Sequence, residues 1–110
     1  MVETKMLYEH IYIGEDIIVR KIECTEKPKT YIQCNGRDFS PDFRRTLKKD
    51  ELSRVLFGYK CCAMYSEEKQ VDKFKQDMID YKARDIERIS ETLKNYQNEL
   101  DSLEKAKEIV

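Results

Sequence analysis

The last 44 residues, from Glu67 to Val110, contain neither glycine nor proline. No residue in this stretch would break a helix, and its apolar residues recur at helical spacing. Ser66 is suited to cap such a helix, because its hydroxyl can accept a bond from a backbone N–H of the first turn. All the glycines and prolines lie in the first 65 residues. The sequence therefore predicts an α+β protein, with a small β-rich head domain over 1–65 and a long amphipathic helix over 66–110.

The distal part of this helix has the apolar spacing of a heptad seam, 3-4-3-4-3. Its seam residues are Ile86, Ile89, Leu93, Tyr96, Leu100 and Leu103. The preceding step, from Tyr81 to Ile86, is five residues, which turns the apolar stripe by about 100°. We interpret this shift as a change of partner, from the head domain to a second helix over 86–110. A local change of supercoil within one continuous coiled coil is the alternative.

The length of the helix indicates that the seam packs on a second copy of the chain. A 44-residue helix extends about 66 Å, whereas a 66-residue globule has a radius of gyration of about 11 Å. The head domain cannot cover the whole seam, and an apolar seam in water is an association site. We therefore expect a coiled-coil homodimer. Ile89 and Tyr96 leave open whether the helices run parallel or antiparallel.

The head domain is expected to form a small antiparallel sheet, or a partial barrel, with one short helix. Stretches rich in β-forming residues predict five strands, over 6–13, 17–24, 30–34, 42–47 and 59–65. Asp50 is a good N-cap for a short helix over 51–57, and Gly58 would end it.

One basic stretch of the head domain, residues 37–54, is the candidate binding site. It contains the candidate partner-binding residues Arg37, Phe39, Arg44, Arg45, Lys48, Lys49 and Arg54, with Phe43 between them. Arginines beside aromatic rings can anchor an acidic protein partner or bind single-stranded nucleic acid by stacking and phosphate contacts. The third interpretation is an ordinary surface whose phenylalanines belong to the core. The net charge of −1 argues against a protein that coats nucleic acid generally.

The sequence contains no combination of residues that indicates catalysis. The single histidine, His10, has no recognisable nucleophile or acid as a partner. The four cysteines lack the Cys-x-x-Cys spacing of a zinc site, and there is no phosphate-binding glycine loop. We therefore expect no enzymatic activity, no metal and no cofactor, and reduced cysteines. No apolar run is long enough to span a membrane and no signal peptide follows Met1, so a cytoplasmic protein with no membrane partner is expected.

Three segments resemble small phage and prophage proteins of low-GC bacteria. They are Glu26–Tyr31, Leu47–Leu52 and the entry from Tyr65–Ser66 into a terminal coiled coil. The resemblance implies a protein that binds and inhibits a host factor, as anti-CRISPR and other anti-defence proteins do, in the host cytoplasm. A nucleic-acid-binding β-domain and a coiled-coil assembly component of a virion are the alternatives.

Overall fold

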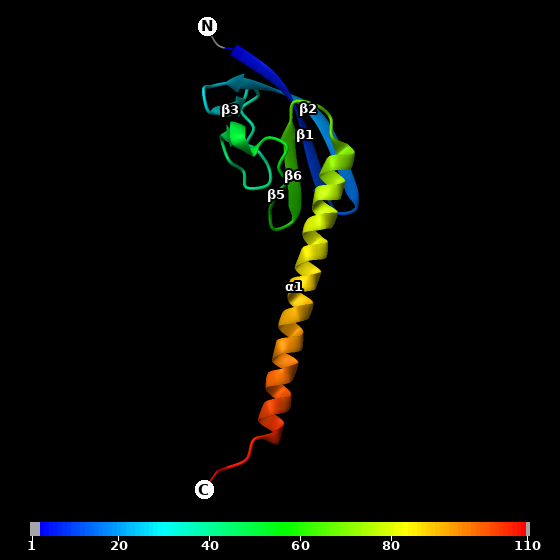
Figure 1. Cartoon of the computed structure of the whole chain (residues 1–110). Coiled ribbons are helices and arrows are strands. Elements are labelled where there is room, and N and C mark those ends of the chain that lie inside the picture. Colours follow the sequence, from blue (N-terminus) through cyan, green and yellow to red (C-terminus); the bar gives the residue numbers. More distant parts are fainter. Residues whose placement is uncertain (1–2, 110) are drawn as a thin grey trace. The chain divides into compact units, whose positions relative to one another are not determined.

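The computed structural model describes residues 3–109, so that Met1, Val2 and Val110 lie outside the described part (Figure 1). Its elements in chain order are β1 (Glu3–Ile13), β2 (Asp16–Glu26), β3 (Thr30–Gln33), β4 (Leu47–Lys48), the 3-10 helix η1 (Lys49–Glu51), β5 (Leu56–Phe57), β6 (Cys61–Ser66) and α1 (Val71–Lys105). The chain divides into two compact units, one ending at Asp77 and one beginning at Met78. Helix α1 runs through this division. The predicted α+β class is confirmed.

The six strands form one curled antiparallel sheet, a half-barrel, in the order β4-β3-β2-β1-β6-β5 (Figure 1). Its centre is the long ribbon of β1 and β2, which pair from Glu3↔Glu26 to Ile13↔Asp16. Gly14 closes the ribbon at a φ of 64°, a conformation that glycine adopts without steric cost. Strand β6 pairs with the free edge of β1.

The curled sheet encloses the main core on one face. The buried residues of this core are Leu7, Ile22, Cys24, Tyr31, Phe39, Leu47, Ala63 and Tyr65. Because successive side chains of a strand point to opposite faces, the neighbours of these residues reach the other face. There His10, Met64 and Phe74 are fully buried, so the first turn of α1 takes part in a second apolar layer.

The short helix expected over 51–57 does not form. Residues 49–51 make a 3-10 helix, Ser53 has a φ of 59°, and β5 follows. Strand β5 pairs with β6 through Leu56↔Ala63, and Gly58 lies in the turn between them instead of ending a helix. The cap at Asp50 and the stop at Gly58 were therefore misleading signals, because pairing with a later strand outweighs a weak local helix propensity.

The long helix begins later than expected. Ser66 is the last residue of β6, where it pairs with Tyr8, and its hydroxyl donates to the Glu68 carbonyl. Ser66 is therefore not the N-cap, and α1 begins at Val71 and ends at Lys105. Pairing with β1 extends the sheet through Ser66 and displaces the helix start by about one turn.

His10 connects β1 to the start of α1. Its Nε2 lies 2.9 Å from the backbone nitrogen of Gln70, and its Nδ1 lies 3.1 Å from the Met64 carbonyl oxygen. Since the backbone N–H can only donate, Nε2 accepts, and the single ring proton lies on Nδ1 and is donated to Met64. The neutral ring thus satisfies a backbone N–H that precedes the first helical turn, and it packs on Phe74 with 5.8 Å between ring centroids.

This geometry predicts that the fold loses stability in mild acid. Burial lowers the pKa of His10 below 6.5, against the raising effect of the Met64 hydrogen bond, and the charge of Lys69 adds to the lowering. A lowered pKa stabilises the fold fully above about pH 6.5, and this stabilisation is lost as the pH falls toward the lowered value. The free energy of unfolding should therefore fall as the pH is lowered below about 6.5, by at most about 1.4 kcal/mol per pH unit.

Urea unfolding followed by circular dichroism measures this dependence. The control is His10→Gln, which cannot titrate and should show a lower but flatter free energy of unfolding over the same range. Equal slopes for the two proteins would contradict the role assigned to His10.

Candidate functional site

The first half of the basic stretch lies in the loop between β3 and β4. Phe39 and Arg44 pair as an isolated bridge, with N···O distances of 2.7 Å and 3.1 Å for the two reciprocal hydrogen bonds. Ser40, Pro41, Asp42 and Phe43 form the turn between them, with a cis peptide before Pro41. The loop is therefore a small hairpin, in place of the fourth strand expected over 42–47.

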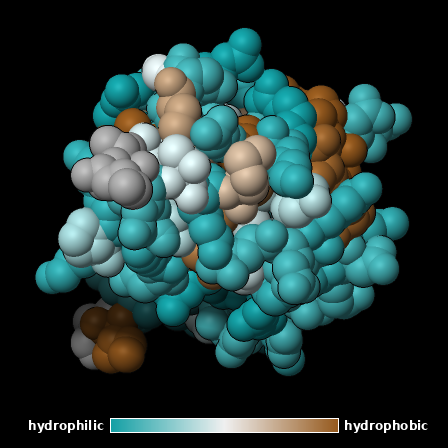
Figure 2. Space-filling model, turned by 90° about the horizontal axis from the view of Figure 1, so that it is seen from above, coloured by the Kyte–Doolittle hydropathy of each residue, from teal (hydrophilic) through white to brown (hydrophobic). Residues whose placement is uncertain are grey.

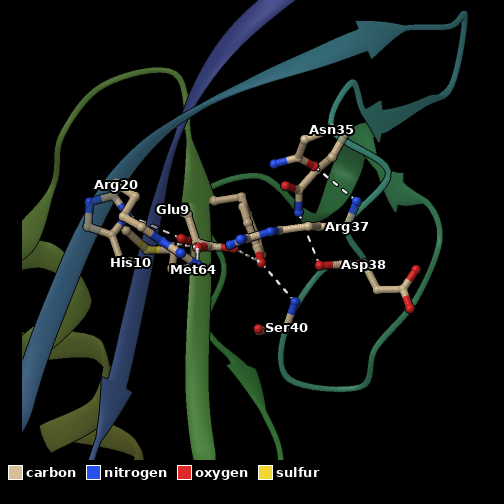
Figure 3. A network of polar contacts seen from close by, with 10 residues as sticks. Glu9, His10, Arg20, Asn35, Arg37, Asp38, Ser40 and Met64 are labelled. Carbon is tan, nitrogen blue, oxygen red and sulfur yellow. Dashed lines mark hydrogen bonds and ion pairs between the residues drawn. The ribbon is translucent and has the colours of Figure 1, made fainter.

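A buried polar network fixes this hairpin to the sheet (Figure 3). The Tyr65 hydroxyl accepts a hydrogen bond from the Ser40 backbone N–H at 2.8 Å and donates to the Glu9 carboxylate at 2.7 Å. The other Glu9 oxygen accepts from the Arg20 guanidinium, with Nη2 at 2.6 Å and Nε at 3.1 Å. Burial, followed by the neighbouring Glu9 carboxylate, raises the pKa of Tyr65. Tyr65 therefore stays protonated and keeps its donor.

Phe39 lies in the core and does not reach the surface. It is fully buried and packs edge-to-face on Tyr65, with 5.1 Å between ring centroids. Phe43 is the exposed ring of the hairpin, at 80% exposure, and its backbone has a φ of 55°. Positive φ is rare for a bulky residue, and here it accompanies a side chain that the protein leaves in solvent. The aromatic side chain available to a partner is therefore Phe43.

Two of the predicted arginines are engaged within the head domain. Arg44 forms an ion pair with Glu51, with Nη2 2.9 Å from Oε2, and Arg45 donates to the Gly36 carbonyl at 3.0 Å. Burial alone would raise the pKa of Glu51, but hydrogen bonds from Arg44 and from the Lys48 backbone N–H lower it below its usual value. Glu51 is thus ionised and neutralises Arg44. Arg44 contributes to the fold of the loop more than to the charge of the surface.

Strand pairing brings Lys48 and Lys49 beside Lys29, which the sequence analysis did not select. Thr30 pairs with Lys48, and the Lys49 backbone N–H donates to the Lys29 carbonyl. A depression of about 430 Å³ lies here, lined by Pro28, Lys29, Thr30, Lys48, Lys49 and Asp50. We call Lys29, Lys48 and Lys49 the lysine cluster. A prediction that the strand over 30–34 pairs with the residues near 48 would have placed Lys29 beside Lys48 and Lys49.

The lysine cluster is only partly neutralised by its surroundings. Lys49 lies 3.6 Å from a Glu26 oxygen and 5.4 Å from the centroid of the Tyr31 ring. Lys29 and Lys48 are exposed, as are Arg37 and Arg54 of the predicted set. On the face seen in Figure 2, hydrophilic side chains predominate and hydrophobic ones form separate areas.

The seam residues of α1 are all exposed in the unit that begins at Met78. Their exposures are Ile86 66%, Ile89 60%, Leu93 67%, Tyr96 65%, Leu100 47% and Leu103 72%. All six lie within the helix and, at a spacing of three and four residues, on one side of it. The predicted seam is thus present as a continuous apolar stripe that no described residue covers.

The described residues include no cluster that could hold a metal ion, and the buried thiol of Cys24 is kept protonated. Between Glu3 and Ile109, no three His, Cys, Asp or Glu side chains are grouped so that they could hold a metal ion. The four cysteines all lie in this range and are not joined by disulfides. Burial, with a smaller effect from Cys34, raises the pKa of Cys24 to about 12, so its thiolate is scarce at neutral pH.

Comparison of the chain with protein-family models, with curated proteins and with solved structures finds no match. The resemblance to phage and prophage proteins therefore stays a prediction. Within residues 3–109, α1 is too polar to cross a membrane, and no other helix is long enough to do so.

The network predicts that removing one hydroxyl group loosens the hairpin. Tyr65→Phe leaves the Ser40 N–H without its partner and removes a donor from the buried Glu9 carboxylate. We expect the free energy of unfolding to fall by about 1–3 kcal/mol, as measured by urea unfolding. The matched control is Tyr59→Phe, because Tyr59 is 97% exposed, and it should leave the stability unchanged. Equal stabilities for the two variants would contradict the anchoring role of Tyr65.

Proposed function

We propose that this chain is a non-catalytic protein-interaction module that forms a homodimer through α1 and presents the lysine cluster to an acidic partner protein. The observation that carries the proposal is the exposed seam from Ile86 to Leu103. Six large apolar side chains on one side of a helix favour burial, at about 25 cal/mol per Å² of apolar surface. Their heptad spacing fits a second helix of the same kind.

The acidic partner is inferred from the charge and shape of the head domain. The three residues of the lysine cluster line one depression. Lys49 lies 3.6 Å from a Glu26 oxygen, and the charge of Lys48 acts on the Glu51 carboxylate. Asp50 also lines the depression, but three lysines against one aspartate leave the net charge of its lining positive. A complementary acidic surface would gain attraction and a faster association rate. Phe43, exposed on the loop between β3 and β4, is a ring of the kind that supplies much of the binding energy in protein interfaces.

Single-stranded nucleic acid is the second candidate ligand, and one observation favours it. Phe43 and Tyr59 are exposed at 80% and 97%, and bases stack on exposed rings. The turns that carry them are in contact, because a Cβ placed on Gly58 would lie 2.4 Å from Pro41 Cβ. Exposed lysines of the head domain would then contact phosphates.

The dimer is tested by charging the seam. Leu93→Asp with Leu100→Asp places two carboxylates on the apolar stripe of each helix, where burial in a dimer would be costly. We expect the wild-type chain to be a dimer and this variant a monomer, as measured by light scattering after size exclusion.

The matched control is Asn95→Asp with Asn98→Asp. It adds the same two charges to the same helix away from the seam, and should leave the dimer intact. A wild-type monomer at tens of micromolar would refute the proposal, and so would loss of the dimer in the control alone.

The ligand is tested with two probes at low salt, a fluorescent glutamate-rich peptide and a fluorescent oligothymidine. Lys29→Glu with Lys48→Glu should weaken peptide binding at least about tenfold, because two attractions become repulsions. Lys75→Glu with Lys94→Glu makes the same charge change on the exposed side of α1 and should leave binding unchanged. Binding of oligothymidine alone would favour the nucleic-acid function, and failure of both probes would contradict both ligands.

A further inference from the structure

We infer that the two helices of the dimer run antiparallel, with Ile86 of one copy beside Leu103 of the other. This inference rests on the proposed homodimer and specifies its partner and geometry. Two features of α1 distinguish the orientations: the position of the one tyrosine on the seam, and the charges that flank the seam.

The seam packs more evenly in the antiparallel orientation. A parallel pair places each seam residue opposite itself, so that two Tyr96 side chains meet in one layer and both hydroxyls must leave the apolar seam to find water. An antiparallel pair that uses all six seam residues instead joins Ile86 to Leu103, Leu93 to Tyr96, and Leu100 to Ile89. Each Tyr96 ring then packs on a leucine, and the two hydroxyls lie in separate layers.

The flanking charges disfavour the parallel orientation. In a parallel heptad pair, the residue just before Ile86, Leu93 or Leu100 faces the residue five positions later on the other helix. Charges at these flanking positions set the orientation of the two helices. This geometry brings Glu99 of each copy to Glu104 of the other, which gives two like-charge contacts. The remaining flanking pairs, Asp85 with Ser90 and Thr92 with Gln97, supply no opposite charges to offset them.

The antiparallel orientation removes both like-charge contacts. In the register that pairs Ile86 with Leu103, Glu104 faces Ala83 of the second copy and Glu99 faces Thr92. Asp85 keeps its ion pair with Arg88 of its own helix, at 2.7 Å, and faces Ala106. Each of these flanking pairs therefore contains one charged residue and one uncharged residue, and none brings two like charges together.

Disulfide trapping at the two ends of the seam tests this orientation. Ile86→Cys and Leu103→Cys are prepared as separate full-length variants, oxidised alone and as an exchanged mixture, and analysed by denaturing electrophoresis without reductant. The oxidised wild type measures the background from the four native cysteines. Light scattering establishes beforehand that both variants are dimers.

The antiparallel dimer predicts a covalent dimer above background only in the mixture, because a disulfide needs Cβ atoms within about 4.5 Å. Covalent dimers from each variant alone would show a parallel pair and overturn the inference. If both variants are dimers but neither they nor their mixture form a covalent dimer, the proposed register is wrong. A monomeric wild type would instead refute the proposed homodimer, so that the two failures are distinguishable.

Discussion

Two consecutive buried polar side chains of β1, Glu9 and His10, hold the head domain together from opposite faces of the sheet. Because successive side chains of a strand point to opposite faces, Glu9 and His10 lie on opposite sides of the sheet. Glu9 binds Tyr65 and through it the Ser40 backbone, whereas His10 accepts the Gln70 N–H that precedes α1. A buried polar group is costly unless it is hydrogen-bonded. Each connection is therefore favoured by the cost of leaving Glu9 or His10 unpaired.

This arrangement explains how a small sheet can support both parts of the proposed function. The hairpin that carries Phe43 has no long strand pairing of its own, and its position depends on the bond from Ser40 to Tyr65. The start of α1 depends on His10 and on Ser53, whose hydroxyl donates to the Gln70 side chain at 3.1 Å. The bonds that hold the hairpin and the start of α1 are made by the side chains of Tyr65, His10 and Ser53. The exposed side chains of the head domain, such as Phe43, are not needed for these bonds and can contact a ligand.

The sequence predicted well those elements whose pattern is local. The ribbon of β1 and β2, strands β3 and β6, and the long helix all have a clear period in the sequence. The region from 42 to 57 was predicted wrongly, because its structure depends on distant partners. Leu56 joins a strand only because Ala63 is beside it, and Phe39 is buried only because Tyr65 is there.

The candidate site shows the same dependence on distant contacts. The basic stretch was visible as a run of charges, but the structure divides it. Arg44 and Arg45 are engaged within the head domain, while Lys29, which precedes the run in the sequence, lines one depression with Lys48 and Lys49. Spacing alone could not separate these residues. The seam from Ile86 to Leu103 needed only helical geometry, so its exposure could be anticipated, although a second helix on it remains a proposal.

Sedimentation equilibrium of the unmodified chain tests the central claim, that an exposed seam brings two copies together. The chain has a mass of 13.2 kDa. The account predicts twice that mass at tens of micromolar, with dissociation on dilution that follows a monomer–dimer equilibrium. A mass of 13.2 kDa throughout that range would contradict it, because six exposed apolar residues at heptad spacing would then have no partner in a second copy.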